Sequence, residues 1–295
     1  MLITVFTPTY NRAYILPKLY ESLVGQSYTD FEWVVVDDGS TDDTRTLMQN
    51  FIAEKKISIQ FYQQQNQGKH IAINKGAAMA GGELFFTVDS DDYLLPHALQ
   101  QIAKHWKDVS GLEDQHQIIG IGANRVYQNG NVIGGDVDYE VLDTDLIDYR
   151  FRKKYKGDKA EIYITEIVRA HPFPHIKGET FCPEALVYYR LANEGKQLRF
   201  VNEHWYICEY LDDGLTNSGF NTVRRGPLGN LISLSDVVKF RNTPALIKIK
   251  YAILFWRFSF WEKTKSFATK SAMMPPFYIL FYPVGYFFYQ KDKKR

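Results

Sequence analysis

The sequence predicts an α/β fold in which a mostly parallel sheet carries helices on both faces and a basic, aromatic helical extension follows. Two observations in the first hundred residues predict the sheet. Short apolar, β-branched runs alternate with segments whose apolar residues recur at helical spacing. The runs are almost continuously apolar, as expected of strands covered on both faces. A third observation, a change in charge near residue 219, separates the extension from the rest.

The first hundred residues are expected to form four strands and three helices in alternation. The strands are expected at 2–6, 31–36, 57–62 and 84–88, and the helices at 14–24, 44–51 and 71–79. Parallel sheets of this kind bind ligands beyond the carboxyl ends of their strands. The loops that follow the four strands should therefore share one functional rim.

Each of these loops is polar, and no two have the same composition. In chain order they read TPTYNR (7–12), DDGSTDDT (37–44), NQGKH (66–70) and DSDD (89–92). None matches the glycine-rich dinucleotide loop or the P-loop, so the two commonest phosphate cradles are absent from the sequence. A rim this acidic needs a metal ion to hold phosphate.

The DSDD segment places three carboxylates directly after an apolar run. Carboxylates this close repel one another unless a cation joins them, and oxygen ligands beside a phosphorylated substrate favour a hard divalent ion. A helix N-cap or a turn is the alternative, because Asp and Ser favour such positions and Pro96 follows closely. The other three loops favour the metal and phosphate site.

Taken in order, TPTYNR, VVVDDGSTDDT, NQGKH, DSDD and a later acidic segment resemble the family-2 glycosyltransferases over roughly residues 2 to 215. The resemblance implies the GT-A fold, which has a Rossmann-like, mostly parallel sheet. It also implies inverting transfer of a sugar from a nucleotide diphosphate sugar, favoured to be UDP-linked, to a hydroxyl of a lipid-linked or surface glycan. Mn²⁺ or Mg²⁺ would be the cofactor. The QxxRW segment of processive synthases is absent from the sequence, which favours a single addition.

The resemblance also assigns the donor site by motif position. Asp38 would accept the N3 proton of uracil, and one aspartate of DSDD would contact ribose while another binds the metal. Helix capping is the alternative for Asp38 and is expected at Asp42 or Asp43. The sequence leaves open whether Asp91 or Asp92 dominates the coordination. The donor-binding residues are Thr7, Pro8, Tyr10, Arg12, Asp38, Lys69, Asp89 and Ser90, and the metal ligands are Asp89, Asp91 and Asp92.

The catalytic base that the resemblance implies is Glu184. Many family members carry Glu-Asp before a helix that ends in Arg-Leu, and alignment of that pair on Arg190-Leu191 places the catalytic carboxylate on Glu184. The chain departs from the pattern, because Pro183 replaces the first acid and Glu replaces the usual Asp. A first-turn acid that favours the helix dipole is the alternative role. Glu179 is the reserve candidate for the base.

The charge of the chain is divided between two predicted domains. Residues 1–218 are expected to form the catalytic domain, with a nucleotide half (1–110) and an acceptor half (111–218), and residues 219–295 the extension. From Phe220 onward 14 basic residues stand against three acids, so the extension carries about +11 of a net charge of +1. The catalytic domain is therefore acidic.

The extension combines this charge with Trp, Tyr and Phe. Such a composition favours peripheral attachment to an anionic membrane surface. Three prolines, Pro275, Pro276 and Pro283, argue against a spanning helix in the uncharged stretch 271–290. Packing of these aromatics on the protein core is the alternative. No signal peptide is recognised before the first strand, so a cytoplasmic position on the inner face of the cell membrane is expected.

Other partners and functions are less consistent with the sequence. Cys182 and Cys208 provide no disulfide framework, no nucleic-acid-binding module is recognisable, and nothing indicates the oligomeric state. A nucleotidyl or other nucleotide-sugar enzyme, or a catalytically silent membrane scaffold, remains an alternative. A transferase releases a nucleoside diphosphate from its donor, whereas nucleotidyl transfer releases pyrophosphate.

Overall fold

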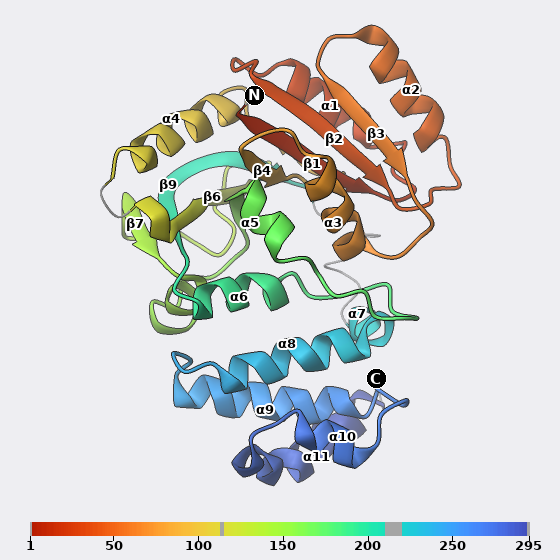
Figure 1. Ribbon diagram of the computed structural model, residues 1–295, viewed down its shortest axis with the longest axis vertical. Helices are drawn as coiled ribbons and strands as arrows, with labels where there is room; N and C mark the ends of the chain where they lie inside the picture. The colour runs from red at the N-terminus through yellow and green to blue at the C-terminus, as the bar shows by residue number, and fades with distance from the viewer. Residues whose placement is uncertain (1, 113–114, 210–219, 294–295) are drawn as a thin grey trace.

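A computed structural model describes residues 2–112, 115–209 and 220–293 (Figure 1). A nine-stranded sheet with helices on both faces forms one end of the molecule, and stacked helices form the other (Figure 1). The predicted boundary between residues 218 and 219 lies outside the described residues.

The first half of the sheet is parallel and confirms the predicted alternation of strands and helices. The four strands lie in the order β3-β2-β1-β4. Their bounds are β1 (Ile3–Thr9), β2 (Phe31–Asp37), β3 (Ile59–Gln63) and β4 (Leu84–Thr87), and the helices between them are α1 (Leu16–Val24), α2 (Thr44–Glu54) and α3 (Lys69–Met79). Because the strands are parallel, the four polar loops follow them at one edge.

The second half of the sheet is mixed. β8 pairs antiparallel with both β4 and β6, whereas β6 and β9 are parallel and two short strands pair antiparallel with β9. The bounds are β5 (Tyr93–Leu94), β6 (Ile118–Tyr127), β7 (Val141–Thr144), β8 (Lys159–Ile164) and β9 (Gln197–Cys208). Two short helical segments, η1 (Gln115–Gln117) and η2 (Asp148–Arg152), complete this half. These strands therefore extend the sheet beyond β4, into the half expected to bind the acceptor.

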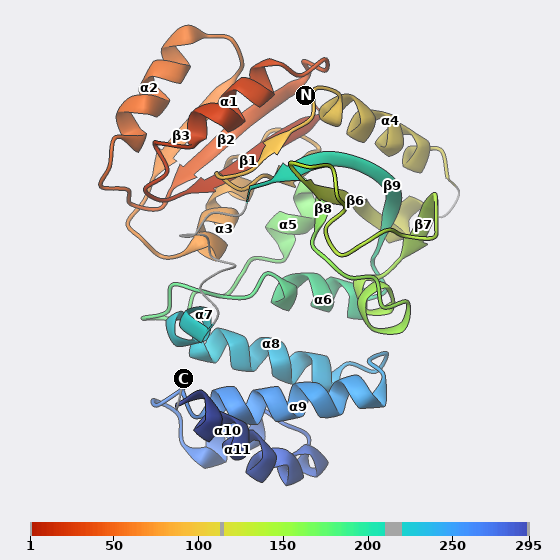
Figure 2. The same ribbon diagram turned by 180° about the vertical axis from the view of Figure 1, so that it is seen from behind.

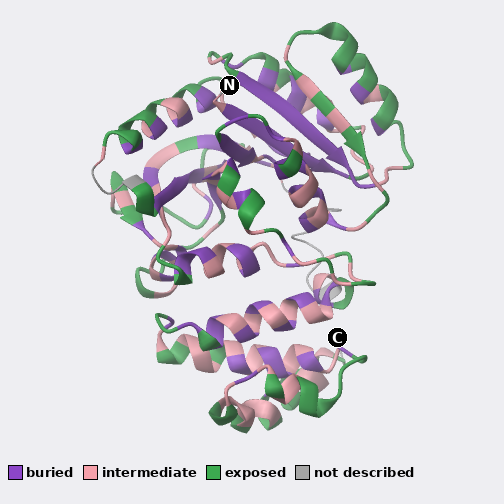
Figure 3. Cartoon of the chain, viewed as in Figure 1, coloured by how far each residue is buried: buried purple, intermediate pink, exposed green. Residues whose placement is uncertain are grey.

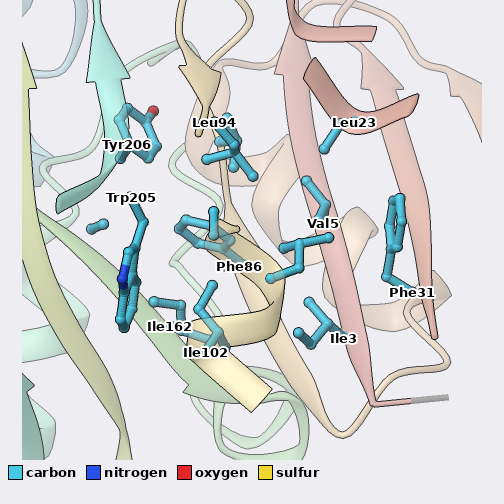
Figure 4. Close-up of a cluster of buried hydrophobic side chains, with 14 of the residues drawn as sticks. Ile3, Val5, Leu23, Phe31, Phe86, Leu94, Ile102, Ile162, Trp205 and Tyr206 are labelled. Atoms are coloured by element: carbon cyan, nitrogen blue, oxygen red, sulfur yellow. The ribbon is translucent and has the colours of Figure 1, made fainter. Parts of the chain in front are cut away.

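Two hydrophobic cores hold the helices against the sheet. One core contains side chains of α1, α2 and α4 (Ala98–Ser110), packed around Trp33 and Phe86. Figure 4 shows Phe86 in this core together with Leu23 of α1 and Ile102 of α4. The other contains side chains of α3, α5 (Thr165–Ala170) and α6 (Ala185–Asn193), packed around Phe6 and Phe200. Figure 2 shows the first set of helices in front of the sheet, and Figure 1 shows the second.

The C-terminal helices form a module with a third core. The elements are α7 (Phe220–Arg225), α8 (Pro227–Lys239), α9 (Ala245–Ser259), α10 (Phe267–Ala272), the 3₁₀ helix η4 (Pro276–Phe281) and α11 (Tyr282–Asp292). Phe255 and Trp256 of α9 are fully buried against Leu231 of α8, while Val237 and Phe240 connect α8 to the sheet's second core. Part of the aromatic content of the extension is therefore internal packing.

Other aromatics of this module are exposed, mostly on η4 and α11 (Figure 3), namely Phe267, Phe277, Tyr286, Phe287 and Phe288. None of the helices described is both long enough and apolar enough to cross a membrane.

Candidate active site

Three charged side chains from separate motifs meet at the rim of the sheet. Lys69 Nζ lies 2.6 Å from Asp89 Oδ1 and 2.8 Å from Glu184 Oε1. Burial alone would lower the pKa of Lys69, but the charges of Asp89 and Glu184 outweigh it and raise this pKa. The ammonium group therefore stays charged and joins the aspartate motif to the predicted base.

The backbone explains why these three residues meet. Lys69 is the first residue of α3, Asp89 follows β4, and Glu184 immediately precedes α6. The loop before α3 passes close beneath the segment that leads to Glu184: a Cβ atom on Gly68 would lie 2.0 Å from the carbonyl oxygen of Thr180. Gly68 also has φ +94°, which disfavours any side chain.

We therefore expect Gly68→Ala to be strongly destabilising. Strain at positive φ and the clash with Thr180 should together lower the unfolding free energy by about 2 to 4 kcal/mol. Urea unfolding followed by circular dichroism measures this change. Gly130→Ala is the matched control, because Gly130 has φ +84° but open space around it. Equal losses of unfolding free energy in the two variants would show that the close approach of Gly68 to Thr180 contributes nothing.

Arg125 is part of this site although no sequence motif indicated it. Its guanidinium group lies 4.2 Å from the ring centroid of Tyr206, and its NH1 atom is 3.8 Å from Asp89 Oδ2. The backbone N–H of Asp89 donates to the Tyr206 hydroxyl at 3.0 Å. Burial raises the pKa of Asp89, but Lys69 and Arg125 outweigh that effect and lower it. Asp89 is therefore fixed and ionised.

Asp91 and Asp92 have the opposite electrostatic balance. Burial and the charge of Asp89 raise the pKa of Asp91, and the same two causes raise the pKa of Asp92 to about 7. Asp92 Oδ1 accepts the backbone N–H of Glu209 at 2.9 Å. The nearby cationic side chains thus do not fully balance the negative charge that these two carboxylates have when ionised.

This imbalance is the observation that fits a divalent cation at the DSDD turn. Oxygen ligands suit Mn²⁺ or Mg²⁺, and Mg²⁺ typically takes only one or two protein carboxylates, with phosphate oxygens and water as its other ligands. Among the residues the structure describes, no three His, Cys, Asp or Glu side chains converge as a ready-made metal site. A site of two carboxylates completed by the donor's phosphates is consistent with both observations.

Asp38 organises the loop that follows β3. Its Oδ1 accepts from Gln64 Nε2 and the Gln67 backbone N–H, both at 2.9 Å, and its Oδ2 accepts from the Gly68 N–H at 2.7 Å. A carboxylate offers about four acceptor positions, so about one remains for a ligand. The side chain is 5% exposed. The carboxylate therefore supports the loop before Lys69 whether or not it also reads a base.

The other predicted donor residues differ in how accessible they are. Thr7 is fully buried and its hydroxyl accepts from Trp33 Nε1 at 3.0 Å, so its side chain is engaged in the core. Pro8 and Ser90 are buried, whereas Tyr10 is exposed. Arg12 lies close enough to Asp91 for its charge to offset part of the rise in that residue's pKa. Tyr10, Asn11 and Arg12 are thus the members of TPTYNR that are not buried.

Asp42 supports the start of α2. Asp42 accepts from the backbone N–H and hydroxyl of Thr44 at 3.1 and 2.6 Å, as expected for a residue at the start of a helix. His70 is buried, and its Nδ1 atom has no hydrogen-bond partner.

Glu179 caps α8. Its two carboxylate oxygens accept the backbone N–H groups of Leu228 at 2.7 Å and Gly229 at 2.9 Å. Backbone N–H groups in the first turn of a helix have no hydrogen-bond partner within the helix. The structure thus turns Glu179 toward the C-terminal module, whereas Glu184 is turned toward Lys69.

A wall of aromatic and acidic side chains stands beside Glu184. The ring of Tyr188, one turn further along α6, stacks on Tyr163 with centroids 4.5 Å apart. The Tyr163 hydroxyl donates to Glu161 Oε2 at 2.8 Å, and Arg150 NH2 lies 3.8 Å from Glu161 Oε1. Burial raises the pKa of Glu161. Tyr163 is itself buried, so within this group the half-buried Glu161 and Tyr188 are the side chains that can present surface next to the predicted base.

The family of this chain follows from comparison with known proteins. The model of glycosyl transferase family 2 matches residues 4–165, more than half of the chain, and the chain therefore belongs to this family. It is 37% identical over 121 residues to an uncharacterized glycosyltransferase of Nostoc, covering 40% of this chain and 38% of that protein. It is 26% identical to glycosyltransferase GlyG of Streptococcus pneumoniae, covering 86% of both chains.

A third relative has a more specific name. The GalNAc(5)-diNAcBac-PP-undecaprenol beta-1,3-glucosyltransferase of Campylobacter jejuni is 36% identical over 102 residues, which is 34% of this chain and 33% of the relative. The chain thus spans about a third of the length of this protein and of the Nostoc relative.

Solved structures confirm the predicted GT-A fold. TarS of S. aureus matches 91% of this chain and 45% of its own with a TM-score of 0.64 at 18% identity. A shorter TarS, in complex with UDP-GlcNAc, matches with a TM-score of 0.60 at 18% identity and 92% and 76% coverage. The mannosyltransferase PcManGT of Pyrobaculum calidifontis, in complex with GDP-Man and Mn²⁺, matches with a TM-score of 0.55 at 15% identity and 96% and 83% coverage.

Proposed function

We propose that the protein transfers one sugar, with inversion, from a nucleotide diphosphate sugar to an acceptor hydroxyl. The observation that carries the proposal is the ion-paired chain Asp89–Lys69–Glu184, in which one ammonium group contacts both the aspartate motif and the predicted base. Donor phosphates at the aspartate motif and an acceptor hydroxyl at Glu184 would meet at the same rim of the sheet. A sugar between them would be attacked from the side opposite the leaving diphosphate.

The roles of the side chains follow from this arrangement. Glu184 takes the proton of the acceptor hydroxyl while the oxygen forms its bond to the anomeric carbon and the bond to the diphosphate oxygen breaks. Asp89, held by Lys69 and Arg125, would orient the ribose. Asp91 and Asp92 would hold Mn²⁺ or Mg²⁺, which when bound stabilises negative charge on the diphosphate. Lys69 also lies where it can approach that group.

For the donor we propose a UDP-linked sugar. The neighbouring TarS structure holds UDP-GlcNAc, while PcManGT holds GDP-Man, so the fold accepts more than one base. Asp38 favours uracil over cytosine, because its remaining acceptor position suits the N3–H donor that uracil has and cytosine lacks. Tyr10, Arg12, Pro8 and Ser90 would complete the donor site.

The base assignment predicts a change in nucleotide preference. In the wild-type protein UDP should bind more tightly than CDP, because cytosine has no N3–H to donate. Asp38→Ala should remove most of this preference, about tenfold for one hydrogen bond to a charged group. Titration calorimetry with both nucleotides measures the ratio.

The ratio separates base recognition from loop support. Loss of the contacts of Asp38 with Gln64, Gln67 and Gly68 weakens both nucleotides alike and leaves their ratio unchanged. A UDP to CDP ratio that survives in Asp38→Ala contradicts the uracil assignment.

For the acceptor we propose a lipid-linked or surface glycan. One relative is named as acting on an undecaprenol-linked sugar, and another as a teichuronic acid biosynthesis enzyme. Glu161 would bind acceptor hydroxyls, and Tyr188, supported from behind by the buried Tyr163, would stack against a sugar ring beside Glu184. The basic C-terminal module would place the protein on the anionic inner face of the cell membrane, where such acceptors are held.

A further inference from the structure

The end of the chain displays a row of exposed apolar side chains. η4 and α11 follow each other without a break, and Phe277, Leu280, Val284 and Phe287 recur along them at intervals of three and four residues. Phe277 is 64% exposed, Leu280 70% and Phe287 54%. Residues at this spacing occupy one side of a helical segment. Figure 3 shows η4 and α11 at the end of the molecule farthest from the sheet.

Tight packing on the other side of α11 fixes this row at the surface. Gly285 is buried against α9, and a Cβ atom there would lie 2.4 Å from the Cβ of Trp256. The ring of Tyr282 meets the Trp256 ring edge-on with centroids 5.2 Å apart. The exposed row is therefore the outer side of a packed helix, since the inner side already has its core.

Positive charge lies at the end of α11 and in the segment before α10. Lys263, Lys265, Lys291 and Lys293 are exposed, and Lys291 Nζ lies 4.6 Å from the ring centroid of Phe287. The one acid between residues 263 and 293 is Asp292. Its carboxylate is 2.5 Å from Arg257, and its side chain is only 5% exposed.

We propose that this surface is a membrane face that enters the headgroup region of an anionic phospholipid bilayer. The membrane face comprises Phe277, Leu280, Val284, Phe287 and Phe288 together with Lys263, Lys265, Lys291 and Lys293. The apolar side chains gain burial at the acyl boundary, and the lysines meet lipid phosphates. The inference rests on the proposed function only in that a lipid-linked acceptor gives the contact its purpose.

The charge of the membrane face favours an anionic bilayer over a second copy of the chain as the partner that binds it. A twofold contact through this surface would bring the lysines of one copy near those of the other, with Asp292 already paired to Arg257. Anionic lipid supplies the opposite charge at every lysine. The row is also narrow, as suits a helix lying in an interface.

Vesicle sedimentation of the full-length protein tests the proposal. Wild type should sediment with vesicles containing phosphatidylglycerol and much less with pure phosphatidylcholine. The double substitution Leu280→Glu with Phe287→Glu should lower partitioning by about 100-fold, because it removes two buried side chains and adds repulsion. Replacing Lys263 and Lys291 by Gln should lower it about fivefold per lysine at low salt and less at high salt.

The control is Ile52→Glu, which removes an exposed apolar side chain of α2 in the catalytic half. It should bind vesicles like wild type, and circular dichroism should show all variants folded. The proposal is overturned if the wild-type protein does not sediment with phosphatidylglycerol vesicles. It is also overturned by a wild-type dimer that the double substitution converts to a monomer without any change in vesicle binding, because a second copy would then cover the face.

The outcome is independent of the proposed sugar transfer. Hydrolysis of a nucleotide sugar in solution, without vesicles, reports the catalytic site alone and should be the same in wild type and the double variant. Vesicle binding without hydrolysis leaves the membrane face standing and contradicts the transferase. Hydrolysis without vesicle binding supports the transferase and contradicts the membrane face.

Discussion

Glu184→Gln should lower turnover by about 10² to 10⁴, the range expected for loss of a positioned general base. The substitution keeps the size of the side chain and an oxygen that accepts from Lys69, but an amide does not take a proton from the acceptor. Affinity for the nucleotide and the metal should stay close to wild type. Because the acceptor is not identified, hydrolysis of the donor by water under single-turnover conditions is the measurement, since water needs the same base.

Glu179→Gln is the matched control for this prediction. Its side chain caps α8 through Leu228 and Gly229, so the substitution weakens one of two capping hydrogen bonds. It should lower the unfolding free energy by about 0.5 to 2 kcal/mol and leave turnover unchanged. An inactive Glu179→Gln beside an active Glu184→Gln would show that the base is Glu179 and that the alignment through Arg190-Leu191 is wrong.

Removal of the divalent metal should lower turnover by about 10³ or more, because several kcal/mol of charge stabilisation are lost. Asp91→Asn and Asp92→Asn should also lower turnover. In both variants Mn²⁺ should also cease to strengthen UDP binding, a readout that does not depend on activity. The measurement is calorimetry of UDP binding with and without Mn²⁺, together with donor hydrolysis in EDTA and after Mn²⁺ is restored.

Asp43→Asn is the control for the metal prediction, because Asp43 is an exposed acid at the start of α2. It should keep full metal dependence. Wild-type turnover that persists in EDTA would contradict the assignment of Asp91 and Asp92.

The first half of the fold was predictable because its determinants are local. Apolar runs and helical spacing placed β1 to β4 and α1 to α3 within a few residues of their observed bounds. The second half was not predictable in the same way. β8 lies between β4 and β6, and β9 runs parallel to β6 about 80 residues earlier in the chain. Short sequence patterns carry no information on such distant pairings.

The candidate site shows the same division. The motifs indicated Lys69, Asp89 and Glu184 separately, but their meeting depends on the close approach of Gly68 to Thr180. Arg125 and Tyr206 lie in strands with no motif, and only the pairing of β6 and β9 places Arg125 on the Tyr206 ring. Thr7 matched the motif, yet the alternation of β1 turns its side chain into the core.

The extension shows where composition alone is ambiguous. The same Trp, Tyr and Phe content is consistent with a packed module and with a lipid-facing surface. The structure divides the residues between both: Trp256 is buried with Phe255, whereas Phe277 and Phe287 are exposed. The difference depends on which residues meet α8 and α9, which a count of aromatic residues does not reveal.

In the proposed function, the protein breaks the bond between the sugar and the diphosphate of its donor. The most direct measurement is identification of the nucleotide released when the full-length protein is incubated with a panel of nucleotide sugars and Mn²⁺. We predict a nucleoside diphosphate, most abundant with UDP-linked donors and reduced by the Glu184→Gln substitution. Release of pyrophosphate in a reaction with a nucleoside triphosphate and a sugar phosphate, with no nucleoside diphosphate formed from any donor, would contradict the account.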